Sequence, residues 1–332
     1  MWGDSSFAVR RDMLATMKTL ARILACLFGL LALLLIVGVA ATWAPDRPVS
    51  ELRARWAPPP SVFVDLGGMQ VHLRDEGPHD DPTPIVLLHG TSASLHTWEG
   101  WVQALKAQHR VIRFDLPGFG LTGPSPDGVY SIESYVRFMQ GMLDKLGIAR
   151  CVLAGNSFGG SVSMATALAF PGRVEKLILV DSGGYPPQSI SVPIAFRLAQ
   201  LPVLNRLALI ALPRQIIESS VRKSYGDPSR VTPELVDRYF EITLREGNRR
   251  AVAERFRQAP SGIFADQIPK LKLPTLILWG GRDLLVPPVI AERFHHDIAG
   301  SQVVMFDDLG HVPQEEDPVR TVAAVVQFLA VR

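Results

Sequence analysis

The sequence predicts an α/β fold, with a mainly parallel sheet flanked by helices, an inserted helical cap and an N-terminal transmembrane helix. Apolar strand patterns alternate with helical patterns over residues 85–180, which is typical of a parallel sheet covered on both faces. The strand pattern then stops until residue 267, and an uncharged apolar run occupies residues 23–44. The 332 residues fit one sizeable domain behind an anchor, and the net charge of +2 gives no reason to expect a nucleic-acid partner.

Residues 23–44 predict a membrane-spanning helix, because they carry no charge and are almost all aliphatic from residue 24 to residue 37. About 20 helical residues, at ~1.5 Å each, cross the ~30 Å hydrocarbon core of a bilayer. We therefore expect a transmembrane anchor at 23–44 behind a cytoplasmic segment at 1–22. A signal peptide cut after Ala41 is the alternative, since small residues precede that position.

Basic residues are slightly more numerous before this span than after it. Those before it are Arg10, Arg11, Lys18 and Arg22, and those after it are Arg47, Arg53 and Arg55. Because positive charge tends to remain in the cytoplasm, we expect a single-pass membrane protein with its catalytic domain on the non-cytoplasmic side. Residues 45–60 are rich in proline and predict a stiff, extended spacer.

The first part of the soluble core is expected at residues 61–184. It begins with strands at 61–66 and 69–75 around Gly67 and Gly68, a pair that suits a two-residue hairpin turn. The strands and helices expected next lie at 85–89, 95–107, 111–114, 132–146, 151–154 and 177–180, with a further helix directly after residue 157.

Helical spacing without strands predicts a cap over residues 185–265. Its expected helices lie at 194–207, 214–225, 233–245 and 248–258. The core resumes at 266–332 with strands at 274–279 and 302–306 and a closing helix from about residue 318. A cap inserted after the sixth strand would lie over the site and exclude water from it.

The segment Gly155-Asn156-Ser157-Phe158-Gly159 joins a predicted strand to a predicted helix. A serine between two glycines on such a turn forms a nucleophile elbow, which exposes the hydroxyl beside backbone N–H groups. We therefore expect Ser157 to be a catalytic nucleophile, which needs a base and a group that orients the base. Asp283 and His311 each follow a later predicted strand. Asp181, after the strand at 177–180, is the alternative acid.

With these motifs in this order, residues 61–332 resemble the α/β-hydrolase superfamily, in its capped serine-hydrolase branch of esterases and lipases. Residues 85–91 resemble the strand and oxyanion loop of that family, and residues 114–120 resemble its strand-4 turn. The resemblance implies the α/β-hydrolase fold.

The resemblance also implies a role for each site residue. His311 would take the proton of Ser157 as its hydroxyl attacks a carbonyl, and Asp283 would hold the imidazole in the required tautomer. The backbone amides of Thr91 and Phe158 would form the oxyanion hole. The implied reaction is hydrolysis of a small carboxylic ester with an apolar acyl group through an acyl-enzyme.

Two other functions stay open. Asn156 resembles the residue at the same position in hydrolases that cut carbon–carbon bonds of ring-cleavage diketones, although Thr91-Ser92-Ala93-Ser94 lacks their glycine-rich loop and Val312 stands where they often carry tryptophan. A non-catalytic, ligand-binding receptor on the same fold is the third possibility.

We expect no cofactor and no metal ion, since His295-His296 has no cysteine or carboxylate at ligand spacing. His89 is expected to be a structural histidine bonded to its own loop. Trp98 and Trp101 could line the acyl pocket or pack the first helix, and the sequence leaves both open.

Overall fold

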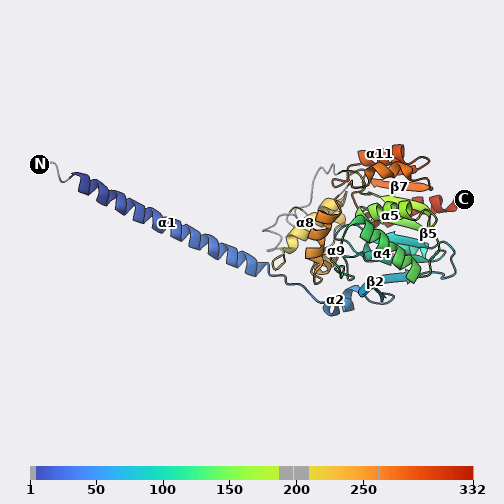
Figure 1. The fold of residues 1–332 in the computed structure, drawn as a ribbon, viewed down its shortest axis with the longest axis horizontal. Coiled ribbons are helices and arrows are strands. Elements are labelled where there is room, and N and C mark those ends of the chain that lie inside the picture. Colours follow the sequence, from blue (N-terminus) through green and yellow to red (C-terminus); the bar gives the residue numbers. More distant parts are fainter. Residues whose placement is uncertain (1–4, 187–196, 198–208, 261, 332) are drawn as a thin grey trace.

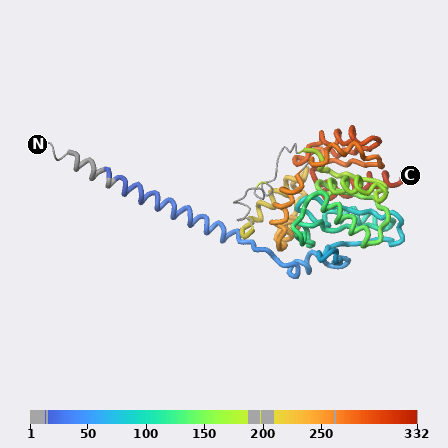
Figure 2. The backbone as a smooth tube through the Cα atoms, viewed as in Figure 1, coloured from blue at the N-terminus to red at the C-terminus, as the bar shows by residue number. Residues whose placement is uncertain are grey.

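The structure is a computed structural model that describes residues 5–186, 197, 209–260 and 262–331. Its sheet, with mainly parallel pairings and helices on both faces, confirms the predicted fold class. One long helix, α1 (Ser5–Ala41), extends away from the rest of the chain (Figures 1 and 2). Within it, Thr16–Ala41 is the one stretch of the described chain long and apolar enough to cross a membrane, and it is not buried against the protein. Its length and composition suit a membrane anchor or a signal sequence.

The segment between α1 and the sheet differs from the predicted extended spacer. Val49–Trp56 forms a helix, α2 (Val49–Trp56), with Glu51 in its first turn and Arg53 and Arg55 in its last turn, where their charges suit the helix dipole. The prediction of an extended spacer is therefore wrong for this stretch. Proline marks the boundaries of the helix, but it does not keep the residues between them extended.

We call residues 42–56, which follow α1, the post-α1 segment. The backbone amide of Ala44 donates to the carbonyl of Ile210, and the amide of Leu212 donates to that of Thr42, both at 2.9 Å. Ala44 is buried in a cluster with apolar cap residues, and Leu52 is 1 % exposed. This segment is therefore part of the folded body.

The sheet has eight strands in the order β1-β2-β4-β3-β5-β6-β7-β8. The strands are β1 (Val62–Leu66), β2 (Met69–Glu76), β3 (Ile85–Leu88), β4 (Val111–Phe114), β5 (Cys151–Asn156), β6 (Val174–Val180), β7 (Thr275–Gly280) and β8 (Gln302–Phe306). The pairings of β2 with β1 and β4 are antiparallel, and all others are parallel. Gly67 and Gly68 both have positive φ, as the predicted hairpin turn requires.

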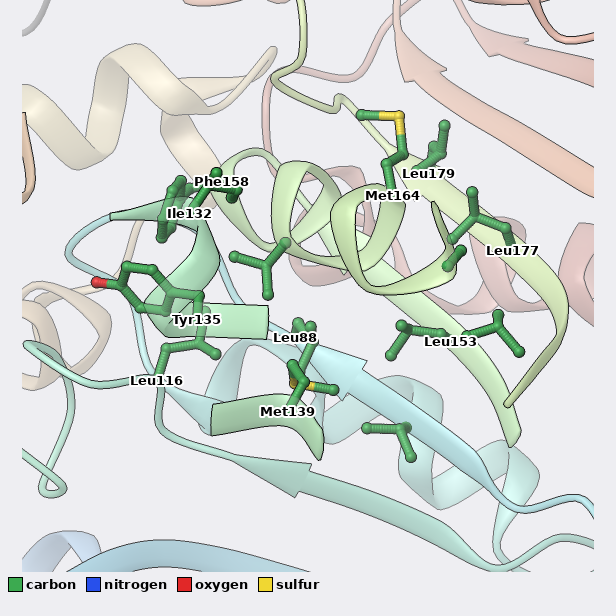
Figure 3. Close-up of a cluster of buried hydrophobic side chains, with 14 of the residues drawn as sticks. Leu88, Leu116, Ile132, Tyr135, Met139, Leu153, Phe158, Met164, Leu177 and Leu179 are labelled. Atoms are coloured by element: carbon green, nitrogen blue, oxygen red, sulfur yellow. The ribbon is translucent and has the colours of Figure 1, made fainter. Parts of the chain in front are cut away.

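Side chains alternate along each strand and build a core on both faces of the sheet. On β3, Val86 and Leu88 face the cluster under α4 (Ile132–Lys145), α5 (Phe158–Ala169) and α11 (Val289–Asp297). Figure 3 shows Leu88 among side chains of α4 and α5 in this cluster. Ile85 and Leu87 face the opposite cluster. Its helices are α3 (Glu99–Leu105) and α13 (Pro318–Ala330), with η1 (Leu95–Trp98) and α12 (Pro313–Glu316) beside them.

Trp98 and Trp101 belong to this second core. Both side chains are fully buried there, and Trp101 Nε1 donates to Thr321 Oγ1 at 2.9 Å. They therefore pack the first helix of the core against α13, which decides between the two alternatives left open by the sequence.

The described helices between β6 and β7 form the cap beside the sheet (Figure 1). Its described elements are α8 (Arg214–Ser224), η2 (Pro228–Arg230), α9 (Pro233–Thr243) and α10 (Asn248–Gln258), followed by η3 (Ala265–Lys270). The helices predicted at 214–225, 233–245 and 248–258 are confirmed. The one predicted at 194–207 lies outside the described residues, apart from residue 197.

Candidate active site

Ser157 occupies the tight turn between β5 and α5. Its φ of 53° and ψ of −117° form a backbone conformation that L-residues rarely adopt. The turn can close because both neighbouring glycines lack side chains. A Cβ on Gly155 would lie 2.3 Å from the carbonyl carbon of Gly159, and one on Gly159 would lie 2.2 Å from the carbonyl oxygen of Leu88. The local structure is thus the strained elbow that the sequence predicts.

His311 and Asp283 meet at the same edge of the sheet. His311 Nδ1 lies 2.7 Å from Asp283 Oδ2, and both side chains are buried. Because an ionised carboxylate only accepts hydrogen bonds, Nδ1 carries the proton and Nε2 presents a lone pair. The second carboxylate oxygen of Asp283 accepts backbone N–H groups of Leu285 at 2.7 Å and Val286 at 3.0 Å, which fixes its orientation.

The loop that carries His311 is held from three directions. Its amide donates to the carbonyl of Ser224 in the cap at 2.7 Å, and its carbonyl accepts from Asn156 Nδ2 at 2.9 Å. The buried carboxylate of Glu316 accepts the backbone amides of Gly310 and Gly226. Asn156 and Glu316 thus position the histidine backbone.

The hydroxyl of Ser157 makes no hydrogen bond with His311 among the residues that the structure describes. In ligand-free hydrolases this contact is often long and tightens only when substrate binds.

Asp181, the alternative acid, lies beside Asp283 but does not contact the imidazole by a hydrogen bond. Its Oδ1 accepts the amide of Gly280 at 2.9 Å, while Oδ2 has no partner in the described part of the chain. Burial, and then the neighbouring Asp283 carboxylate, raise the pKa of Asp181 well above its usual range. Asp181 is therefore a buried carboxyl whose pKa is shifted upward, and Asp283 is the carboxylate that contacts His311.

Asp181, Asp283 and His311 bring potential metal ligands within 4.8 Å of one another. His311 Nδ1 carries the proton that it donates to Asp283. This nitrogen therefore has no lone pair for a metal ion.

Thr91 and Phe158 belong to two segments that meet at the elbow, since a Cβ on Gly90 would lie 3.1 Å from the Cβ of Ser157. Thr91 follows β3, and Phe158 begins α5. Neither backbone amide donates a hydrogen bond within the described residues, so both are available to an external acceptor. The loop of Thr91 is held by His89, whose Nδ1 lies 2.7 Å from the carbonyl of Gly90 and whose Nε2 accepts the amide of Leu116 at 3.0 Å. The predicted structural role of His89 is confirmed.

Sequence reasoning missed Arg255, which reaches this loop from the cap. Arg255 Nη2 donates to Thr91 Oγ1 at 2.8 Å. Its position in the sequence, in a run of charged residues on a predicted helix, is that of a solvated surface residue and gives no signal of this contact.

Comparison with known proteins gives one consistent result for the core. A family model described as alpha/beta hydrolase fold matches residues 83–318. The chain is 31 % identical over 281 residues to the 2-hydroxy-6-oxo-2,4-heptadienoate hydrolase of Pseudomonas putida, covering 81 % of this chain and 95 % of that one.

Two solved structures extend the comparison. A thermophilic esterase from Thermogutta terrifontis is 28 % identical, has a TM-score of 0.66, and covers 81 % of this chain and 97 % of its own. A bacterial membrane phospholipase A is 24 % identical, has a TM-score of 0.69, and covers 96 % of this chain and 98 % of its own. The fold likeness of the latter therefore reaches beyond the hydrolase core into the N-terminal part of the chain.

Proposed function

The chain belongs to the α/β-hydrolase family, and from that premise we propose that it is a serine hydrolase that cleaves carboxylic esters. Ser157 is the nucleophile, His311 the general base and acid, and Asp283 the group that orients the imidazole. The observation that carries this proposal is the 2.7 Å hydrogen bond from His311 Nδ1 to Asp283, at the sheet edge where the strained elbow holds Ser157.

In the proposed mechanism, His311 Nε2 takes the proton of Ser157 as the hydroxyl oxygen attacks the ester carbonyl. The carbonyl oxygen becomes negative and accepts hydrogen bonds from the backbone amides of Thr91 and Phe158. Each such donor stabilises the transition state by about 3 kcal/mol. The C–O bond then breaks, and the alcohol leaves with the proton from His311. A water molecule repeats the attack on the acyl-enzyme and releases the acid.

Carbon–carbon bond hydrolysis is the second candidate. It is favoured by the Pseudomonas putida relative, whose name specifies a dienoate that carries a keto group. The esterase of Thermogutta terrifontis, at 28 % identity, favours ester cleavage. The oxyanion loop also supports ester cleavage, since it has Thr91 and Ser92 where carbon–carbon hydrolases resembling this chain have glycines.

The test compares both reactions on one preparation. p-Nitrophenyl esters of increasing acyl length should be hydrolysed, and a 2-hydroxy-6-oxo-dienoate should lose its visible absorbance far more slowly or not at all. Faster turnover of the dienoate would make carbon–carbon cleavage the function. If neither substrate is turned over and a fluorophosphonate does not label Ser157, the non-catalytic, ligand-binding receptor becomes the proposed function.

We further propose that α1 anchors the protein in a membrane with the hydrolase body on the non-cytoplasmic side. The exposed apolar side chains of Thr16–Ala41 and the slight excess of basic residues before them support this topology. The protein should then stay in the membrane fraction through an alkaline carbonate wash, and protease added to spheroplasts should reach the hydrolase body. A mature chain that begins near Thr42 would instead identify a cleaved signal peptide.

A further inference from the structure

Arg255 contacts both residues whose amides form the proposed oxyanion hole. Its Nη2 donates to Thr91 Oγ1 at 2.8 Å, and its Cζ lies 4.5 Å from the centroid of the Phe158 ring. Phe256 adds a second ring at 4.1 Å. The side chain comes from α10 in the cap and is 5 % exposed. One arginine of the cap therefore touches the two core elements that frame the reacting carbonyl oxygen.

No carboxylate neutralises Arg255 among the described residues, whereas other buried arginines are paired. Arg113 lies against Glu76 and Glu99, and Arg249 lies against Asp46. Residues 187–196 and 198–208, which the structure does not describe, contain no Asp or Glu in the sequence. Burial lowers the pKa of Arg255 to about 10, so the guanidinium still carries its charge at neutral pH.

A buried charge without a counter-ion destabilises the fold, and such arrangements are found mainly where function requires them. Here the charge contacts the side chains of both residues whose amides would face the oxygen of a tetrahedral intermediate as it becomes negative. In a dry site the attraction between two such charges is much stronger than in water. The hydrogen bond to the Thr91 hydroxyl also fixes the loop whose amide must point at that oxygen.

We propose that Arg255 is a positioning residue of the oxyanion hole. It holds the Thr91 loop through the threonine hydroxyl, and its unneutralised charge favours the negative oxygen between the amides of Thr91 and Phe158. This inference rests on the proposed serine-hydrolase function and adds to it that the cap completes the oxyanion hole.

The test uses Arg255→Met, which keeps apolar volume but removes the charge and the donor. With a p-nitrophenyl ester, kcat should fall about 10- to 100-fold, somewhat less than for loss of a direct donor, while KM stays within about 3-fold. An alkyl trifluoromethyl ketone, which forms a negative hemiketal on the nucleophile, should bind more weakly by the same factor as kcat/KM falls. Arg255→Lys should recover part of the lost kcat and part of the lost ketone affinity.

Arg249→Met is the matched control, because Arg249 lies on the same helix and is buried but is paired with Asp46. It should lower the melting temperature while leaving kcat and ketone affinity within about 3-fold of wild type, as expected away from the reacting atoms. If Arg255→Met fails to fold, Thr91→Val removes the same hydrogen bond at nearly constant volume and should give the same split between kcat and KM.

Unchanged kcat and ketone affinity in folded Arg255→Met, or in Thr91→Val, would overturn the inference. A rise in KM confined to anionic substrates at constant kcat would also overturn it, because Arg255 would then bind substrate charge. Failure of the proposed function is seen separately in the wild-type protein, where a fluorophosphonate would leave Ser157 unlabelled.

Discussion

The sheet edge that carries the proposed triad and the post-α1 segment differ in what holds their side chains. At the sheet edge, Ser157 follows β5 directly, Asp283 lies three residues after β7, and His311 lies five residues after β8, and short turns orient them. The post-α1 segment, residues 42–56, is held by partners some two hundred positions away in the cap. Asp46 accepts the amide of Gly247 at 3.0 Å, and Trp56 Nε1 donates to Glu241 at 2.7 Å.

The sheet edge should therefore determine activity, and residues 42–56 should determine how stably the cap is held on the core. Changes at the sheet edge should remove activity and leave the fold intact, because each reactive group follows a strand of the core. Changes in the post-α1 segment should reduce stability and leave the chemistry intact until the cap loosens. The cap links the two regions, since Arg255 donates to Thr91 and Ser224 accepts the amide of His311.

The largest effect is expected at the nucleophile. Ser157→Ala should lower kcat for ester hydrolysis by about 10⁴-fold or more, because the triad cannot act without its nucleophile. The melting temperature should stay close to that of wild type, since a smaller side chain fits the elbow. Ser163→Ala, on the same helix and bonded to the carbonyl of Gly159, is the control and should keep its activity. Comparable activity in both variants would remove Ser157 from the mechanism.

The two buried carboxylates should differ strongly in catalysis. Asp283→Asn should reduce kcat by about 10⁴-fold, because an amide in place of the carboxylate favours the wrong imidazole tautomer. Asp181→Asn should change kcat by less than about 10-fold, since Asp181 does not contact His311. Steady-state kinetics of both variants decide the assignment, and the reverse ranking would make Asp181 the acid.

Two truncations test the role of the post-α1 segment. Removal of residues 1–41 should yield a soluble enzyme with wild-type kcat. Removal of residues 1–60 takes away the buried side chains of Ala44 and Leu52 and leaves Arg249 without Asp46. Its free energy of unfolding should therefore fall by about 3 kcal/mol or more, measured by urea denaturation against the shorter truncation. Equal stability of the two truncated proteins would show that the segment is only a spacer.

A smaller effect is expected from Asp181 on stability. Burial raises the folded-state pKa of Asp181 above its unfolded value, so the folded state holds the proton more tightly. Its contribution to stability is therefore complete below the unfolded pKa and is lost as the pH rises through the folded pKa. Asp181→Asn should accordingly gain stability relative to wild type as the pH rises above about 4, the ordinary pKa of a carboxyl in the unfolded chain, with no gain below it. A constant difference from pH 4 to pH 8 would contradict this origin.

Much of the sheet edge could be predicted from the sequence because each element there carries a local pattern. The elbow glycines, the strands before Asp283 and His311, and the hairpin at Gly67-Gly68 are all encoded by a few neighbouring residues. Their spatial meeting follows from parallel strands, whose carboxyl ends lie at one edge of the sheet.

The remaining features depend on contacts that no local pattern reports. The prolines around α2 suggested an extended spacer, but packing of Leu52 against the body favours a helix. The sequence around Trp98 does not indicate which face of the sheet its side chain packs on, because its cluster with α13 forms only in the folded chain. The contact between Arg255 and Thr91 joins positions 164 residues apart, which only the folded cap can define.

The central claim, that Ser157 carries the acyl group of an ester substrate, is tested most directly by intact-protein mass spectrometry during turnover. Wild-type protein mixed rapidly with a p-nitrophenyl ester and quenched in acid should show a mass increase equal to the acyl group, and digestion should map it to the peptide containing Ser157. The adduct should build up in Asp283→Asn more slowly than in wild type and be absent from Ser157→Ala. An adduct on another residue, or ester turnover without any adduct in the presence of a normal Ser157, would contradict the account.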